Sequence, residues 1–395
     1  MVSHHPGFTI GHRCHLSFHF VAILLSVLCI IFNTGQTIGL TLFLGSFQNL
    51  TGAYFVVFFG AFSYGFAASL LACWFGYKGQ ITPAMREWRW TKYMLVISIF
   101  DAANAILNTF SSHGSRVPPA LTAILNQITI PFTFVFSKYL LRKQYRWSHY
   151  LSICLILIGV TFSLIPIFRR MHNGTTETAL KEGWYWPLIY ILGCIPNAIK
   201  SILQEKLQVN FTEYAKGRQE KITRFSVSYF NAAETSFQVM IIIVCFTLDL
   251  IPGFGTSTNV EQWWTSFSNG FKCFFNVEHL AGSRCQVAPA TGMLYIICCL
   301  LTSLVATFLT DHLSANWLAI VTSISPLLST SFWFIFPGIN RWAGVGEMTS
   351  WDIGFNLGAL PIIFIGMVLY SDGGTDRETG EEIPLLEEHP MEFLW

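Results

Sequence analysis

Ten long apolar runs, separated by shorter polar stretches, dominate the chain. They cover residues 16–44, 52–77, 92–111, 117–140, 148–168, 185–207, 224–250, 289–310, 315–338 and 350–370. Crossing the hydrocarbon core of a membrane takes about 20 residues of α-helix. Because lipid offers no hydrogen-bonding partners, each run must satisfy its own backbone groups and is therefore predicted to be helical. The pattern predicts an all-α membrane protein with ten transmembrane helices.

Composition agrees with this class and argues against others. Hydrophobic residues make up 52% of the 395 residues and charged residues only 11%. Soluble proteins usually carry about 25% charged residues. The formal net charge is +1, which argues against a nucleic-acid partner, because neutralising phosphates requires a clustered basic excess. The ten cysteines form no CxxC pair and no His/Cys cluster with metal-ligand spacing, so we expect neither a metal nor a cofactor.

Positive charge is divided unevenly between the two sides of the predicted membrane. If both termini are cytosolic, the segments on that side hold about twice as many Lys and Arg residues as the opposite side, as the positive-inside rule requires. The non-cytosolic loops then include the sequon at Asn173, a predicted glycosylation site, and the longest loop, 251–288. Cys273 and Cys285 are the only cysteines outside the spans on that side, and an oxidising lumen favours a disulfide between them.

The segment 371–395 is polar and acidic, which predicts a disordered cytosolic tail. Within it, Glu381 stands four positions before the pair Leu385 and Leu386. This spacing resembles the dileucine signals that sorting adaptors read on lysosomal and vacuolar membrane proteins. A sorting adaptor is therefore an expected partner, and a vacuolar or lysosomal membrane is the expected location.

A weak internal repeat relates the two halves of the chain. Residues 120–136 align with residues 315–331 at a constant offset, which places Pro131 over Pro326 in the middle of two predicted helices. Five helices per half is an odd number, so the second half must enter the membrane from the opposite side. The sequence thus predicts a cytosolic segment 1–15 and a ten-helix transporter domain 16–370, with inverted halves 16–168 and 185–370. Inverted halves allow a central site to open alternately to either face.

Several stretches carry a resemblance to a known family. They are Ile97–Ala102 with Gln127–Pro131, Trp264–Cys273, Ile195–Glu205, and the pair Asn231 and Gln238. These residues resemble the chloroquine-resistance-transporter-like family of the drug/metabolite transporter superfamily, over about residues 20–370. The resemblance implies ten helices in two inverted halves, with both termini in the cytosol. It also implies proton-driven export of amino acids, short peptides or cationic drugs from a digestive vacuole or lysosome. Plant members move thiol peptides across plastid membranes.

The chain departs from this family at two places. Family members have four cysteines before the eighth helix, whereas this chain has only Cys273 and Cys285 there, so at most one of the two family disulfides is implied. The first-helix position associated with drug selectivity falls at Asn33 or Thr34. Neither residue is cationic, so repulsion of positively charged cargo is not implied.

Three ionisable residues lie deep in predicted spans, where a charge costs several kcal/mol and indicates function. Asp101, Lys200 and Glu234 lie about 9 to 15 Å inside their helices at 1.5 Å per residue. On one interpretation the carboxylates line a cavity for cationic or zwitterionic solutes and carry the coupling proton. On the other, Lys200 neutralises Glu234 in a static pair, while Asp101 has no evident partner in the sequence.

Further polar residues complete the predicted pathway of substrate and protons: Asn33, Thr34, Gln127, Asn231 and Gln238. Pro131 and Pro326 are predicted hinges. Three acidic residues near the ends of runs, Glu205, Asp249 and Asp311, are predicted to be interfacial, since charge is cheap there.

These features favour a secondary transporter that exports small organic solutes from an acidic vacuole or lysosome and so supports nutrient and osmotic homeostasis of that compartment. A nucleotide-sugar or sugar-phosphate antiporter of the same superfamily is the alternative, although its anionic cargo would call for more basic residues than Lys200. A membrane-embedded enzyme would need paired catalytic residues, and none stands out. The expected partners are the solute, protons and membrane lipid.

Overall fold

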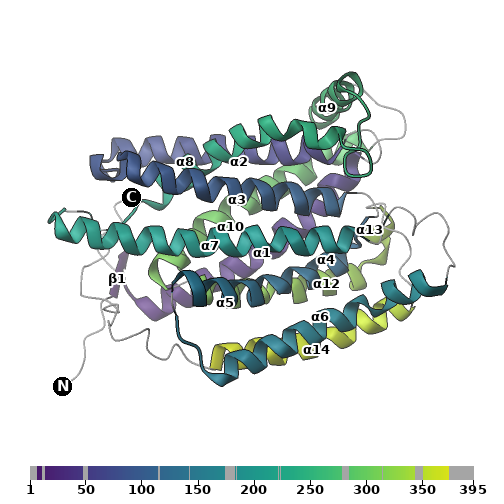
Figure 1. Cartoon of the computed structure of the whole chain (residues 1–395). Helices are drawn as coiled ribbons and strands as arrows, with labels where there is room; N and C mark the ends of the chain where they lie inside the picture. Colours follow the sequence, from purple (N-terminus) through teal and green to yellow (C-terminus); the bar gives the residue numbers. More distant parts are fainter. Residues whose placement is uncertain are drawn as a thin grey trace.

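The computed structural model describes residues 7–10, 14–47, 52–113, 116–141, 143–173, 183, 185–220, 222, 224–277, 284–313, 315–342 and 350–372. Helices running nearly side by side make up most of this part of the chain (Figure 1). The long helices are α1 (Phe18–Phe47), α2 (Ala53–Tyr77), α3 (Trp88–Ser112), α6 (Trp147–Asn173), α7 (Trp186–Gly217), α8 (Val227–Val244), α10 (Ala288–His312) and α14 (Ser350–Asp372). The shorter ones are α4 (Pro119–Leu125), α5 (Thr129–Leu140), α9 (Val260–Phe274), α11 (Ala315–Ser323), α12 (Ser325–Ile335) and α13 (Pro337–Trp342). Short 3₁₀ helices are η2 (Pro83–Arg86), η3 (Asn126–Ile128), η4 (Cys245–Leu250) and η5 (Cys285–Val287).

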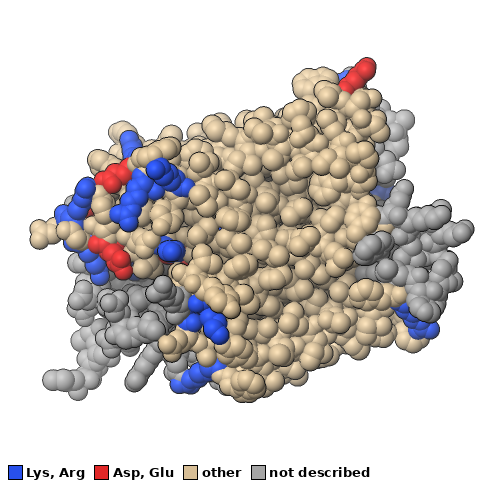
Figure 2. Space-filling view, viewed as in Figure 1, with Lys and Arg blue, Asp and Glu red and all other residues tan. Residues whose placement is uncertain are grey.

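Nine helical segments of the described chain are long and apolar enough to cross a membrane. The tenth predicted run, 315–338, provides only a shorter apolar helix over Ile320–Ile335. The face of the molecule in Figure 2 has a broad zone without charged residues, and most of its Lys and Arg side chains gather at one end. A wide uncharged zone is what the hydrocarbon core requires. The protein is therefore an α-helical, multi-pass membrane protein.

Two elements outside the spans were not predicted from the sequence. A short antiparallel hairpin pairs β1 (Gly7–Ile10) with β2 (Cys14–Ser17) just before α1. The predicted loop 251–288 contains the amphipathic helix α9, whose first turn is capped by the Asn259 side chain, which accepts a hydrogen bond from the backbone N–H of Gln262 at 2.8 Å. A cap of this kind is a common helix start signal, but α9 is too short to register as a span.

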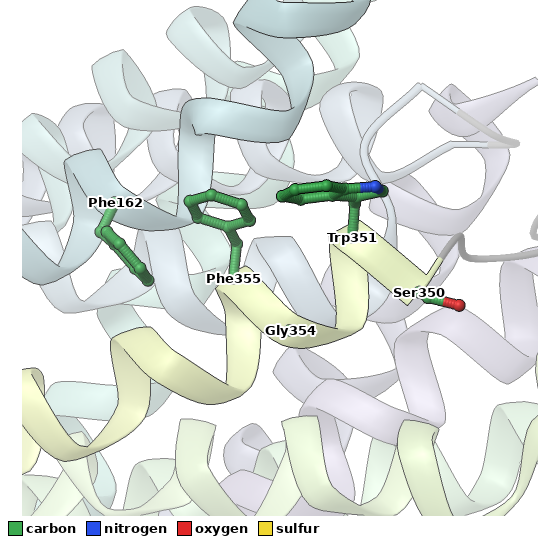
Figure 3. Close-up of a pocket in the computed structure, with 5 residues that line it drawn as sticks. All are labelled: Phe162, Ser350, Trp351, Gly354 and Phe355. Carbon is green, nitrogen blue, oxygen red and sulfur yellow. The ribbon is translucent and has the colours of Figure 1, made fainter.

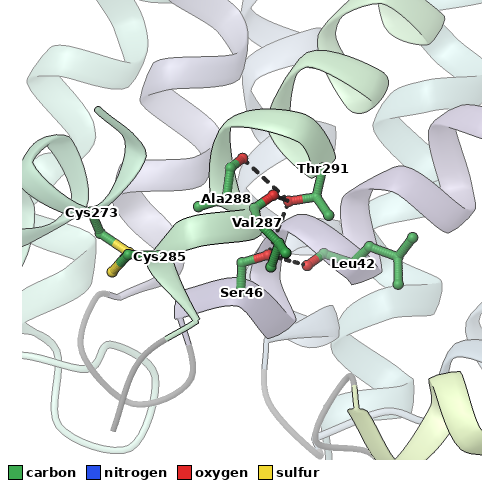
Figure 4. Close-up of a disulfide and its surroundings, with 7 residues drawn as sticks. All are labelled: Leu42, Ser46, Cys273, Cys285, Val287, Ala288 and Thr291. Carbon is green, nitrogen blue, oxygen red and sulfur yellow. Dashed lines mark hydrogen bonds between the residues drawn. A yellow bond between two sulfur atoms is a disulfide. The ribbon is translucent and has the colours of Figure 1, made fainter. Parts of the chain in front are cut away.

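The apolar face of α9 packs on α2 through aromatic rings. The ring centroid of Phe267 lies 5.3 Å from that of Phe58 and 5.9 Å from that of Phe55. At the other end of the helix, Cys273 forms a disulfide with Cys285, the pairing expected from the sequence (Figure 4). Beside this bridge the hydroxyls of Ser46 and Thr291 lie 2.9 Å apart and join α1 to α10. The loop helix is thus held between α2 and α10.

The predicted spans that carry Pro131 and Pro326 are both interrupted near their centres. Between α4 and α5 the backbone tightens into η3, three residues before Pro131. Between α11 and α12 it breaks at Ile324, two residues before Pro326. Proline lacks a backbone N–H, so it leaves the carbonyl four residues earlier without its helical partner. The two breaks lie at nearly equivalent places of the aligned segments.

Helices from the first five spans pack mainly against helices from the last five. The most extensive contacts join α6 to α14, α1 to α10, α3 to α7, and α2 to α8, and α4 also packs on α12. Figure 1 shows α6 and α14 lying side by side along one edge. Small residues allow such helices to approach closely. The Cβ of an alanine at Gly39 of α1 would lie only 3.1 Å from the Cα of Tyr295 in α10.

Candidate functional site

A buried ionic cluster joins three helices inside the bundle. The ammonium nitrogen of Lys200 (α7) lies 2.6 Å from a carboxylate oxygen of Asp101 (α3). It also lies 3.3 Å from a carboxylate oxygen of Glu234 (α8). The prediction that Asp101 lacks a partner is therefore wrong. Lys200 is not reserved for Glu234 but is shared by both carboxylates, and Asp101 is the nearer one.

The cluster has more negative than positive groups, and its three side chains differ in their exposure to solvent. Two carboxylates surround one ammonium, so the fully ionised cluster carries one net negative charge. The Glu234 side chain is 2% exposed, whereas those of Asp101 and Lys200 are 12% and 23% exposed. Removing one partner of a buried ion pair costs about 3 to 5 kcal/mol, because the other charge is left uncompensated. A single proton or one monovalent cation would neutralise this cluster.

Other side chains that sequence reasoning did not single out surround the cluster. Tyr64 of α2 and Cys299 of α10 are within electrostatic range of Glu234 and Lys200, and Tyr295 of α10 is within range of Asp101. Tyr64 is 5% exposed. The sequence does place Tyr64 near the middle of a span, but only 50% of the apolar window of that span is buried inside the protein, so position along the chain alone does not select it.

The predicted α8 residues lie on the same face as Glu234. Asn231, Glu234 and Gln238 are spaced three and four residues apart and are 2%, 2% and 6% exposed, the spacing of one helix face. Asn231 accepts a hydrogen bond at 3.2 Å from the hydroxyl of Thr307 in α10. These amides extend the polar lining of the cluster along α8.

A second group of predicted residues gathers where the proline helices break. The side-chain amide of Gln127 in η3 donates to the backbone carbonyl of Ser323 at 2.7 Å, across the interface between the two broken helices. Thr34 of α1 donates to the carbonyl of Ile30 at 2.8 Å and lies 3.5 Å from that of Ser325. Pro326 has no N–H for the carbonyl four residues before it, so the helix is irregular at this point, and Gln127 bonds a backbone carbonyl within that break.

Within the described residues, no hydrogen bond or ion pair joins this second group to the ionic cluster. The predicted pathway is therefore divided between two places in the bundle. Asn33 is half-buried in α1, and its backbone carbonyl accepts a hydrogen bond from Thr37 at 3.0 Å.

Two of the acidic residues expected at the interface are buried. Glu205 is 7% exposed and forms an ion pair with Lys143, from the segment between α5 and α6. Asp249 is 1% exposed and accepts hydrogen bonds from the backbone and side chain of Thr256 and from Ser257. Both side chains are thus buried among protein atoms, and the expected position of Glu205 at a helix end is wrong. Helix α7 continues to Gly217, ten residues past its apolar run, so Glu205 lies within the helix. The side chain of Asp311 lies outside the described residues.

Two hollows open on the surface of the described structure. One, of about 260 Å³, is a shallow aromatic hollow between α6 and α14, where Phe162, Trp351 and Phe355 present their rings (Figure 3). The other, of about 650 Å³, has a polar lining that includes His113, Arg116 and Glu261, and it lies beside α9. Neither contains a member of the ionic cluster. In the part of the chain that the structure describes, no group of three His, Cys, Asp or Glu residues is arranged to hold a metal.

Two predicted sites lie largely or wholly outside the described residues. Asn173 is the last residue of α6, and the rest of its sequon follows beyond the described helix. The predicted sorting signal at Glu381, Leu385 and Leu386 also lies outside them.

The chain matches one protein family over most of its length. The family model is described as CRT-like, chloroquine-resistance transporter-like, and it matches residues 16–370. Over 256 residues the chain is 24% identical to "Chloroquine resistance transporter" of Toxoplasma gondii, covering 63% of this chain and 26% of that protein. Over 115 residues it is 25% identical to "Crt homolog 1" of Dictyostelium discoideum, covering 29% of this chain and 23% of that protein. The matches thus span about a quarter of each relative's length. The family description and the name of the Toxoplasma gondii relative both contain the word transporter.

One solved structure, titled "Crystal structure of protein", aligns over 89% of this chain and 97% of its own length. Its sequence identity is 13% and its TM-score is 0.45.

Proposed function

The chain belongs to the CRT-like (chloroquine-resistance transporter-like) family, and from that premise we propose that it is a proton-coupled secondary transporter. It exports small organic solutes (amino acids, short peptides, or cationic metabolites or drugs) from an acidic vacuole or lysosome to the cytosol. Both termini are cytosolic, and the tail signal at Glu381, Leu385 and Leu386 directs the protein to that membrane. Replacing both leucines with alanine should then move the protein to the plasma membrane. Unchanged vacuolar residence of the double variant would count against the signal.

The observation that carries the proposal is the ionic cluster of Asp101, Lys200 and Glu234. Its net negative charge inside the membrane provides one place that a proton or a cationic group can fill. An exporter from an acidic lumen gains by loading a proton with its cargo and releasing both at neutral pH. Lys200 is already bound by two carboxylates, which leaves it poorly suited to hold an anionic cargo. The nucleotide-sugar or sugar-phosphate alternative is correspondingly less well supported.

The pairing of helices supports an inverted repeat, with the five helical spans of each half equivalent in order. Exchanging the halves turns the α1–α10 contact into the α7–α3 contact. It maps the α6–α14 and α2–α8 contacts onto themselves, and it exchanges the α4–α12 contact with the α11–α5 contact. The weaker contacts α5–α7 and α12–α1 also exchange. Such symmetry is the basis of alternating access in inverted-repeat carriers.

Uptake into proteoliposomes with an imposed pH gradient tests the proposal, with amino acids, short peptides and sugar phosphates as the solutes screened. Asp101→Asn fixes the cluster in a form that resembles protonation. We expect this variant to exchange labelled solute across the membrane but to fail to concentrate it against a gradient. Asp249→Asn is the matched control, because Asp249 is buried but bonded to neutral partners, and it should still accumulate solute.

The outcomes separate three roles of Asp101. Loss of both exchange and accumulation would assign Asp101 to solute binding or to the structure. Accumulation at the wild-type level would remove Asp101 from the coupling mechanism and leave Glu234→Gln as the next variant to test. Uptake restricted to sugar phosphates would overturn the proposed cargo.

A further inference from the structure

A buried hydroxyl joins α3 to α8 directly beside the ionic cluster. The Ser98 hydroxyl oxygen lies 2.7 Å from the backbone carbonyl oxygen of Glu234. Ser98 is fully buried, and Glu234 is 2% exposed. The contact therefore connects the backbone of one carboxylate residue to the helix that carries the other.

The position of Ser98 on α3 relates its hydrogen bond with the Glu234 carbonyl to both carboxylates of the cluster. Ser98 stands three residues before Asp101, so the two side chains lie on the same face of the helix. One carboxylate of the cluster is thus a single helical turn from the hydroxyl, and the other belongs to the residue whose carbonyl the hydroxyl contacts. Lys200 approaches from α7 and contacts both carboxylates. The spacing of the carboxylates across the ammonium depends on how closely α3 and α8 are held.

We propose that Ser98 is the positioning residue of the ionic cluster, with a hydroxyl that holds α8 against α3 so that Asp101 and Glu234 share the ammonium of Lys200. This deepens the proposed function, on whose coupling site it rests. Ser98 does not itself bind solute or proton. It acts through the geometry of the two carboxylates.

The contact is also one that can break at little cost. The Ser98 hydroxyl lies 2.7 Å from a second acceptor, the backbone carbonyl of Met94 in its own helix. A serine hydroxyl has a single proton to donate, so it can serve only one of the two carbonyls at a time. When α3 and α8 separate, the hydroxyl keeps the Met94 carbonyl as its acceptor, and no buried donor is left unsatisfied.

Several charged and titratable groups surround Glu234, so a pH titration of Glu234 can detect a change in its distances to them. Lys200 faces it from α7, Asp101 from α3, Tyr64 from α2 and Cys299 from α10. Tyr295 of α10 faces Asp101. A shift of α8 changes the distances from Glu234 to all of these groups at once. The pH at which Glu234 takes up a proton therefore reports the spacing that Ser98 sets.

The test compares two serines that make the same kind of bond. Ser98→Ala removes the hydroxyl beside the cluster. Ser152→Ala removes another fully buried serine hydroxyl, which donates at 2.6 Å to the carbonyl of Gly366 and links α6 to α14. Infrared difference spectra of the purified full-length protein follow the protonation of Glu234 through its carboxylic C=O band, which is assigned by its absence in Glu234→Gln. Transport is measured over the same pH range.

In Ser98→Ala we expect the midpoint of the Glu234 band to move by about half a pH unit or more, which corresponds to about 0.7 kcal/mol at 1.36 kcal/mol per unit. Ser152→Ala should leave it in place. Ser98→Thr, which keeps the hydroxyl, should restore the wild-type midpoint. Ser98→Cys, whose thiol is a weak donor, should lie between. If Ser98→Ala does not fold, the midpoints of the Glu234 band in Ser98→Cys and Ser98→Thr are compared instead. A shift in Ser98→Cys that is absent in Ser98→Thr then supports the positioning role, and equal midpoints contradict it.

An unchanged midpoint in Ser98→Ala, or an equal shift in Ser152→Ala, would overturn the positioning role. A shifted infrared midpoint with an unchanged pH profile of transport would leave Ser98 as the positioning residue and would instead refute the cluster as the coupling site. A matching shift of both profiles supports both proposals.

Discussion

Gly270 of α9 touches the ring of Phe55 in α2, and this contact decides how closely the loop helix can lie on the bundle. A Cβ at residue 270 would fall 2.4 to 2.7 Å from three atoms of that ring. Phe55 is 1% exposed and cannot turn away, because Phe59 stacks on it with ring centroids 5.4 Å apart.

Gly270→Ala is therefore expected to lower the free energy of unfolding by about 1 to 3 kcal/mol, the usual cost of overpacking. Gly354→Ala is the matched control: this helical glycine of α14 has no atom within 4 Å of an added Cβ, so alanine should be neutral or stabilising through its helix propensity. Thermal unfolding of both variants in detergent, followed by tryptophan fluorescence, checks this. Equal unfolding temperatures for the two variants would show that α9 does not depend on the contact.

At the residue scale, the sequence indicated which charged residues lie within the helical spans, but it did not indicate which of them form ion pairs. Asp101, Lys200 and Glu234 stood out from the sequence because a charge inside an apolar run is costly. Which carboxylate Lys200 meets depends on the rotation of α3, α7 and α8 about their axes, and packing sets that rotation. Ser98 gave no signal of its own, since a serine within a span is common.

Among the helices, the broken spans are the elements best placed to move. Pro326 deprives the carbonyl of Thr322 of its helical N–H partner. The neighbouring N–H groups then form tighter turns, from Ile324 to the carbonyl of Val321 and from Leu327 to that of Ile324. The carbonyl of Ser323 is instead bonded by Gln127 from the other half.

Pro326→Ala restores the missing N–H and should let α11 and α12 form a more continuous helix. We expect a protein that is no less stable but transports about tenfold more slowly, which corresponds to about 1.4 kcal/mol on the barrier. Pro361→Ala in α14, an exposed proline within an unbroken helix, should transport at the wild-type rate. Initial uptake rates and unfolding temperatures measured together check both expectations. Wild-type transport by Pro326→Ala would contradict a hinge at this break.

At the element scale, run length predicted almost every helix, because about 20 apolar residues have few alternatives to a membrane helix. Two features escaped it. The helix α9 is amphipathic and short, so its signal lies in periodicity and capping rather than in length. The prolines marked the two breaks, but proline also occurs in unbroken helices of this chain, such as Pro196 in α7, so residue type alone could not locate them.

Over the whole molecule, two ion pairs join the first half to the second near the end where α7 finishes. Lys143 follows α5 and pairs with Glu205 of α7, and both side chains are about nine-tenths buried. Glu87, just before α3, lies 2.9 Å from Arg218, just after α7, and it accepts a hydrogen bond from Tyr214 at 2.7 Å. The proposed topology places this end in the cytosol. Opening a carrier there requires the two halves to separate, so both pairs must break in each cycle.

The buried pair should control that opening more strongly than the exposed one. In Glu205→Lys two buried ammonium groups would repel each other. That should prevent closure at this end and slow transport by about tenfold or more, or about 1.4 kcal/mol. The double variant Lys143→Glu with Glu205→Lys should restore transport, because a carboxylate at residue 143 and an ammonium at residue 205 again attract each other. Reversing Glu87, whose partner Arg218 is 57% exposed, should cost little, since solvent screens exposed pairs. Initial rates of solute uptake into proteoliposomes are measured for the wild type, Glu205→Lys, the double variant and the Glu87 variant. Failure of the double variant to restore transport in a folded protein would mean that the residues matter for their packing rather than as a breakable pair between the halves.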